Sequence, residues 1–257
     1  MDYVNLDIKG DIAVLSINRP EAMNALNRQV VDEIDEAIEK INILHNIRTL
    51  VIYSKGNFAA GADIKAMVEC SEKDAKNFAF SDTFNKIENL TFPTVALIEG
   101  YALGGGLELA LACDIRLASF DAKMGFPEIN LGIMPGAGGT VRTPRLAGEA
   151  VARELIFTGR IIDAMEAKDA GLINSVIVPD ELESKGMALA SKLASKAPCA
   201  MSTAKKTIAA GLAEPDKQKA IETEAENWAS LFNTEDQREG MCAFIEKRKP
   251  VYTGRQK

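Results

Sequence analysis

The sequence contains little of what metal sites and nucleophilic triads require. Its only histidine, His45, follows an amphipathic segment, where a surface or capping role is expected. The four cysteines, Cys70, Cys113, Cys199 and Cys242, are dispersed without any CxxC spacing. Transition-metal sites need clustered ligands, and a Ser–His triad needs a histidine. Acid–base chemistry in this chain is therefore expected to rely on carboxylates, Lys, Tyr or Cys.

Common nucleotide-binding and hydrolase motifs are also missing. The sequence has no GxxxxGK[ST] phosphate loop and no GxSxG nucleophile elbow. The glycine-rich run 136–139 does not form a dinucleotide fingerprint, because Val141 occupies the position of the required third glycine. These absences exclude several large enzyme classes before any residue is assigned a role.

The charge balance is acidic, with 30 Lys and Arg against 37 Asp and Glu and a net charge of −7. Nucleic acids and anionic membranes attract basic surfaces, so neither is an expected partner. No apolar run is long enough for a membrane span, and the N-terminal segment MDYVNLDIKGD lacks signal-peptide character. Dispersed cysteines are typical of free thiols in a reducing compartment, so a cytoplasmic location is expected. A mature organelle protein without its presequence would have the same features.

Short apolar segments alternate with amphipathic ones over the first 178 residues, and a helical pattern follows. This order predicts an α/β core with a helical C-terminal portion. The expected strands are 12–17, 49–54, 94–99, 114–118 and 173–178. The expected helices are 29–41, 71–90, 105–112, 146–157, 163–170, 180–196, 199–212, 216–232 and 235–247.

The stretch 98–115, IEGYALGGGLELALACDI, combines a strand end, three consecutive glycines and an apolar helix that contains Glu108. Glycines at a helix start permit close ligand approach and leave N–H groups without intrahelical partners. Such donors favour a developing negative charge. Taken alone, the stretch would also fit a packed helix with Glu108 facing solvent.

Two further loops share small residues and carboxylates: FAAGADIK at 58–65 and FPEINLGIMPGAGGT at 126–140. Together with GYALGGGLELALACD, they occur in the order and at the spacing found in the crotonase superfamily. Ala62 and Glu108 are separated by 46 positions, and Glu108 and Glu128 by 20. Over essentially its whole length the chain closely resembles the enoyl-CoA hydratases of that superfamily.

The resemblance implies an α/β fold: a crotonase-type spiral of ββα turns with an α-helical C-terminal trimerisation region. Residues 1–195 would form the acyl-CoA-binding core and residues 196–257 the oligomerisation region. The expected assembly is a homo-oligomer, a trimer or a dimer of trimers. The expected substrate is an acyl thioester of coenzyme A, and no separate cofactor is expected, because coenzyme A is part of the substrate.

The same resemblance assigns roles to individual residues. Glu108 and Glu128 correspond to the catalytic glutamates, and the backbone N–H groups of Ala62 and Gly105 to the oxyanion hole. Residues expected to contact the substrate or its coenzyme A part are Ala60, Asp63, Ile64, Lys65, Gly136 and Lys247. One departure concerns Glu21, which stands where some family members carry a basic residue near the coenzyme A phosphates.

Three alternatives to a short- or medium-chain enoyl-CoA hydratase remain open at this point. One is a hydratase for an unusual acyl group, such as a cyclic dienoyl thioester, and another is a double-bond isomerase. Isomerases of the family typically keep one of the two acids, so the presence of both favours hydration. A third is a relative that binds RNA, which the acidic residues of helix 29–41 argue against.

Overall fold

The computed structural model describes residues 1–255. The contacts among these residues divide them into two compact units. The first comprises Met1–Leu90 and Thr94–Ala190, and the second comprises Thr91–Pro93 and the chain from Ser191 onward. This division lies near the boundary expected at residue 195, whereas the separate roles expected for the two parts stay predictions.

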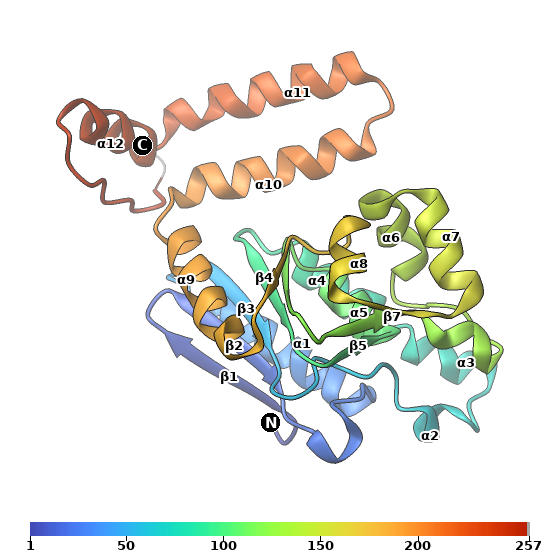
Figure 1. The fold of residues 1–257 in the computed structure, drawn as a ribbon. Coiled ribbons are helices and arrows are strands. Elements are labelled where there is room, and N and C mark those ends of the chain that lie inside the picture. Colours follow the sequence, from blue (N-terminus) through green and yellow to red (C-terminus); the bar gives the residue numbers. More distant parts are fainter. Residues whose placement is uncertain (256–257) are drawn as a thin grey trace. The chain divides into compact units, whose positions relative to one another are not determined.

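A six-stranded sheet forms the centre of the first unit (Figure 1). Its strands, in spatial order, are β1 (Val4–Lys9), β2 (Ile12–Ile17), β3 (Thr49–Tyr53), β4 (Thr94–Ile98), β6 (Ile115–Ser119) and β9 (Ser175–Ile177). The β1–β2 hairpin is antiparallel, and every later pairing in this sheet is parallel. β4 is buried along its whole length, as its uniformly apolar sequence TVALI predicts.

A second, three-stranded sheet consists of β5 (Tyr101–Leu103), β7 (Lys123–Gly125) and β8 (Ile161–Asp163). Successive turns of chain place one strand in each sheet and then form a helix. β4 and β5 precede α5 (Gly105–Leu111), and β6 and β7 precede α6 (Gly139–Ala147) and α7 (Glu149–Thr158). The structure therefore has the ββα turns that the resemblance implies.

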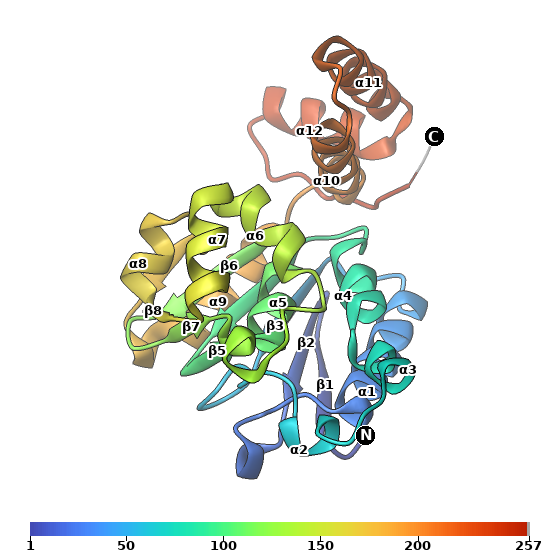
Figure 2. The ribbon, with the colours of Figure 1, turned by 90° about the vertical axis from the view of Figure 1, so that its right-hand side faces the viewer.

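Helices cover both faces of the large sheet. α1 (Arg28–Ile43) lies on one face and α9 (Leu182–Ala194) on the other (Figure 2). α9 approaches β4 so closely that a Cβ on Gly186 would lie 2.9 Å from Cγ of Leu97. Asn27 caps α1 by accepting a hydrogen bond from Val30 N.

The segment 71–90 differs from the single helix expected. It contains α3 (Glu72–Ala75), a short 3-10 turn and α4 (Ser81–Glu88). The break falls at Phe80, whose φ of +29° is incompatible with a helix. Phe84 and Ile87, which lie in α4, are fully buried and pack in the core, as their spacing indicates.

A second difference concerns residues 139–147, where the sequence predicts a helix only from residue 146. The structure instead forms α6 there, with Pro144 inside the helix. Two short helices complete the first unit: α2 (Ile64–Met67) and α8 (Ala164–Asp169). The helix end expected near Gly171 is confirmed, and this glycine has φ +79°.

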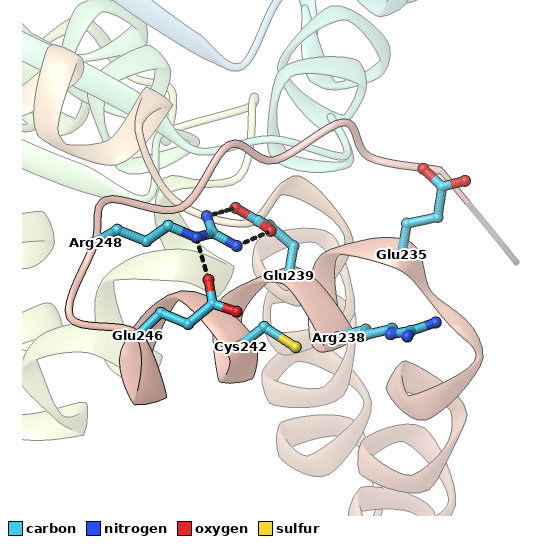
Figure 3. A pocket seen from close by; sticks show the side chains of 6 residues that line it. All are labelled: Glu235, Arg238, Glu239, Cys242, Glu246 and Arg248. Carbon is cyan, nitrogen blue, oxygen red and sulfur yellow. Dashed lines mark hydrogen bonds and ion pairs between the residues drawn. The ribbon is translucent and has the colours of Figure 1, made fainter.

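The second unit contains three consecutive helices: α10 (Pro198–Ala213), α11 (Lys217–Ser230) and α12 (Glu235–Ile245). Thr234 caps α12 by accepting a hydrogen bond from Gln237 N. A surface hollow lies beside α12, and Arg248 there forms ion pairs with Glu239 and Glu246 (Figure 3). Across residues 1–255, each helix is too short or too polar to cross a lipid bilayer.

Candidate active site

Both sheets of the first unit lead into the glycine-rich stretch that the sequence singles out. β5 ends at Leu103, and α5 begins at Gly105 with Gly104 at the N-cap, where a φ of +47° favours glycine. A Cβ on Gly106 would lie 2.8 Å from the carbonyl carbon of Ala59, so the start of α5 packs directly on the backbone of the 58–65 loop. This close packing brings the first two small-residue loops together.

Glu108 lies in α5 and is almost fully buried, with 2 % of its surface exposed. Its Oε1 accepts hydrogen bonds from Ala137 N at 2.8 Å and from Gly139 N at 2.7 Å. Burial raises the pKa of Glu108, while the two N–H donors and the charge of Arg142 act in the opposite direction. The carboxyl group is therefore held at one oxygen by a fixed pair of donors, and the solvent-facing position of Glu108 is excluded.

Glu128 lies in the 3-10 helix η3 (Pro127–Leu131). Its carboxyl group packs against Gly104, where a Cβ would lie 3.0 Å from the carboxyl carbon. Its Oε2 is buried, and no group within residues 1–255 forms a hydrogen bond with it. Burial and the nearby charge of Glu108 raise the pKa of Glu128 to about 7. A buried polar atom without a partner is costly in a folded protein, so this oxygen is a candidate for contact with a ligand.

Gly105 lies close to both Ala62 N and the carboxyl group of Glu108. A Cβ built on Gly105 would lie 3.9 Å from Ala62 N and 4.0 Å from Oε2 of Glu108. Within residues 1–255, neither Ala62 N–H nor Gly105 N–H has a hydrogen-bond acceptor. Two backbone donors without an acceptor among the described residues and one carboxylate oxygen therefore lie close together around Gly105.

The 58–65 loop is fixed by hydrogen bonds on both sides of Ala62. Gly61 O accepts a bond from Leu26 N at 2.7 Å, and Asp63 N donates to Leu26 O at 2.8 Å. The Asp63 carboxylate accepts a bond from Lys65 N and forms a 2.8 Å ion pair with Nη2 of Arg19. Burial opposes ionisation of Asp63, but the hydrogen bond and charge of Arg19 lower its pKa overall. In this structure Asp63 thus caps α2 and anchors the loop.

The remaining residues expected at the site lie in different environments. Ala60 is half-buried and donates its N–H to Met23 O, whereas Ile64 and Lys65 are exposed in α2. Gly136 is exposed and lies next to Ala137, which binds Glu108. Lys247 belongs to the second unit, where it follows α12 with φ +55°. Contacts of these residues with coenzyme A stay predictions.

Sequence reasoning missed the groups that hold the two glutamates. Ala137 and Gly139 supply the donors to Glu108, and Gly104 provides the surface on which Glu128 packs. The available signal was the GAGG run at 136–139, since small residues allow backbone N–H groups to approach a carboxylate. Arg142, which contacts this run, had no signal that separated it from a surface arginine.

Comparison with known proteins gives one consistent result. The family model for enoyl-CoA hydratase/isomerase matches residues 7–255. A short-chain-enoyl-CoA hydratase from Clostridium acetobutylicum is 42% identical over 253 residues, which cover 97% of each chain. A crotonyl-CoA hydratase from Syntrophomonas wolfei is also 42% identical, covering 97% of this chain and 98% of the relative. The crystal structure of an enoyl-CoA hydratase from Bacillus anthracis superimposes with a TM-score of 0.94 at 38% identity, over 98% of this chain and 100% of that one.

Proposed function

Because the chain belongs to the enoyl-CoA hydratase/isomerase family, we propose that it catalyses the reversible hydration of a 2-enoyl-CoA thioester to a 3-hydroxyacyl-CoA. In hydration, the oxygen of one water bonds to C3 and keeps one of its two protons. The other proton of the water passes to a base on the enzyme, and an acid on the enzyme supplies the proton that is added at C2. Two carboxyl groups, one charged and one neutral, can divide this work between them.

The roles of the two glutamates are assigned from the difference between their environments. Burial raises the pKa of Glu108, but its two N–H bonds and the positive charge of Arg142 oppose this rise and favour the ionised form. Glu128 has a buried oxygen without a partner and a negative neighbour, and both favour its neutral form. Glu108 is therefore the base that binds the water, and Glu128 is the acid that delivers a proton to C2.

The N–H groups of Ala62 and Gly105 form the proposed oxyanion hole. As the proton and water add, the thioester oxygen gains enolate charge, and two preorganised donors stabilise it. Each such donor is worth roughly 3 kcal/mol of transition-state stabilisation. Support comes from the absence of any acceptor for either N–H among the described residues and from the position of Gly105, which lies near both Ala62 N and Oε2 of Glu108.

A short 2-enoyl group, such as crotonyl, is the proposed acyl substrate, because the relatives named above are described as short-chain and crotonyl-CoA hydratases. Lys65 and Lys247 are proposed to contact the coenzyme A phosphates, and Ala60 and Ile64 the adenine end. We propose no separate cofactor, since water and two carboxyl groups account for all atoms that are added. An isomerase reaction is not favoured, because it needs no water and leaves one of the two acids without a task.

The second unit is proposed to assemble trimers, or dimers of trimers. Large apolar side chains remain exposed on its helices, among them Leu212 at 72 %, Trp228 at 62 % and Phe244 at 85 % exposure. Exposed apolar surface of this kind is typical of protein–protein interfaces. A cytoplasmic location agrees with four free cysteines and likewise stays a proposal.

Hydration assays with a panel of thioesters from crotonyl to long-chain and cyclic dienoyl test the proposed activity. Glu108→Gln and Glu128→Gln should each lower kcat by roughly 10²–10⁴-fold. The double variant should lose far less than the product of the single losses, because both groups act on one water. Glu149→Gln is the matched control, since this glutamate is exposed and, among the described residues, pairs only with Arg153 one turn away. Full activity in either single variant would show that the two-acid mechanism is wrong.

A further inference from the structure

The guanidinium group of Arg142 occupies a nearly buried position beside the loop that holds Glu108. Its side chain is 8 % exposed. Nη1 donates to Ala137 O at 2.9 Å, and Nη2 donates to Asn85 Oδ1 at 2.7 Å and to Glu88 Oε2 at 2.6 Å. Asn85 and Glu88 lie in α4, so Arg142 connects that helix to the 137–139 loop.

The carbonyl that Arg142 holds lies between the two donors to Glu108. Ala137 N belongs to the peptide group before Ala137, and Gly139 N belongs to the peptide group after Gly138. The carbonyl of Ala137 is part of the single peptide group that separates them. Fixing this carbonyl therefore fixes the backbone rotations on both sides, and these rotations aim the two N–H groups at Oε1 of Glu108.

A second contact ties the same loop to the same helix. Ser81 Oγ, at the start of α4, lies 3.2 Å from Gly136 O, and the same hydroxyl lies 2.6 Å from Ala79 O, so the two carbonyls share one proton. α4 thus contacts the loop at its first residue directly and at Asn85 and Glu88 through Arg142. Phe84 and Ile87 anchor this helix in the core, so it provides a firm support.

We infer that Arg142 is a positioning residue for the proposed hydratase reaction: it clamps the Ala137 carbonyl so that two backbone donors hold Glu108 in the orientation of a water-binding base. The inference rests on the proposed function for its kinetic consequence. Its geometric part concerns only the contacts among α4, the loop and Glu108.

The charged groups around Glu108 define what a pH measurement can report. Glu128 faces it from η3, and Arg142 faces it from α6. Glu88 of α4 neutralises part of the Arg142 charge through their ion pair. Removing Arg142 removes a positive charge that lowers the Glu108 pKa and leaves the negative charge of Glu128, so the Glu108 carboxyl should protonate at higher pH than in the wild type.

The test compares Arg142→Met, Arg142→Lys and the control Arg145→Met. Arg145 lies on the same helix and is exposed, and within residues 1–255 its side chain donates only to Val141 O. Arg142→Met should lower kcat for crotonyl-CoA by roughly 10²-fold, the cost of a misplaced catalytic group, and should shift the acid limb of kcat/KM to higher pH. Arg142→Lys should keep the limb near its wild-type position but still lose kcat, because one ammonium group cannot hold all three acceptors. Arg145→Met should match the wild type in both.

A titration that needs no turnover separates this inference from the proposed function. Nuclear magnetic resonance of protein labelled with ¹³C at glutamate Cδ follows Glu108 directly, with the signal assigned by its loss in Glu108→Gln. The inference predicts a higher Glu108 pKa in Arg142→Met even if the wild type hydrates none of the thioesters. A folded Arg142→Met protein with wild-type kcat and an unshifted Glu108 titration would overturn it. If Arg142→Met does not fold, Glu88→Ala decides: it should lower kcat with KM nearly unchanged, and wild-type kcat would refute the clamp.

Discussion

The raised pKa of Glu128 leads to a quantitative prediction for the pH dependence of hydration. Burial and the charge of Glu108 raise this pKa from 4.5 to about 7. With the ordinary value, about 0.3 % of the carboxyl groups would carry a proton at pH 7, whereas with the raised value about half do. The environment thus increases the population of proton-carrying enzyme roughly 150-fold at pH 7.

The sign of the effect follows from the proposed roles. Hydration needs Glu128 protonated, so kcat/KM should fall as pH rises through about 7, by roughly tenfold for each further pH unit. In dehydration the pair of glutamates also carries one proton, but it starts on Glu108, and Glu128 is ionised. Since both directions use the singly protonated pair, their kcat/KM profiles should share the same limbs.

The assay measures kcat/KM for crotonyl-CoA between pH 5 and 9.5 at constant ionic strength, and for 3-hydroxybutyryl-CoA over the same range. Glu128→Gln should lose the basic limb along with most of its activity, because glutamine does not titrate. Glu149→Gln should keep both the limb and the activity. A profile that stays flat from pH 6 to 9, or a basic limb that persists in Glu128→Gln, would refute the assignment of Glu128 as the acid.

Three further predictions follow from other parts of the structure. Gly105→Ala should fold normally, because its Cβ would lie at least 3.5 Å from its neighbours, but it should lose turnover, because this Cβ lies beside Ala62 N. Gly106→Ala should instead lower the melting temperature, because its Cβ would lie 2.8 Å from Ala59 C. Normal kinetics in Gly105→Ala would place the oxyanion hole elsewhere. Glu33→Ala removes the acceptor for Tyr3 N and Val4 N and should cost about 1–3 kcal/mol of unfolding free energy, measured by denaturant titration against the exposed control Glu36→Ala. Truncation after residue 196 should abolish assembly and activity in sedimentation and hydration assays, and a stable, active full-length monomer would contradict the proposed oligomer.

The sequence predicts well those helices and strands whose pattern of apolar residues is visible within the element itself. β3 and β4 consist almost entirely of apolar residues, and α1 carries its buried residues on one face. β5, β7 and β8 have only three residues each, too few to establish a period. These strands pair with partners far away in the sequence, so a short stretch of sequence gives no sign of the pairing.

The break between α3 and α4 shows the same limit in a different form. Phe80 continues the apolar spacing of Phe84 and Ile87, so the pattern alone favours an uninterrupted helix. In the structure Phe80 is buried with φ +29°, and its ring packs near those of Phe78 and Phe84. Tertiary packing of an aromatic side chain thus outweighs helical continuity at this residue.

Asp63 shows why a residue can be identified as part of a site without its contacts being known. The sequence places a carboxylate directly after Ala62, and ligand binding was the expected role. In the structure that carboxylate pairs with Arg19 and with the N–H of Lys65, and its contact with coenzyme A stays a prediction. Because a distant arginine decides which partner the carboxylate takes, the loop sequence cannot distinguish an anchoring acid from a ligand-binding one.

The two catalytic candidates pose this problem most clearly, since they are the same residue type. Only the resemblance could divide acid from base between Glu108 and Glu128 before the structure was known. Their difference arises from backbone donors at Ala137 and Gly139, which reach one carboxyl group and leave Oε2 of the other without a partner. Backbone N–H groups are common to nearly all residues, so their direction depends on the fold and not on residue identity. A loop that turns two such groups toward one glutamate can therefore separate the roles of two identical side chains.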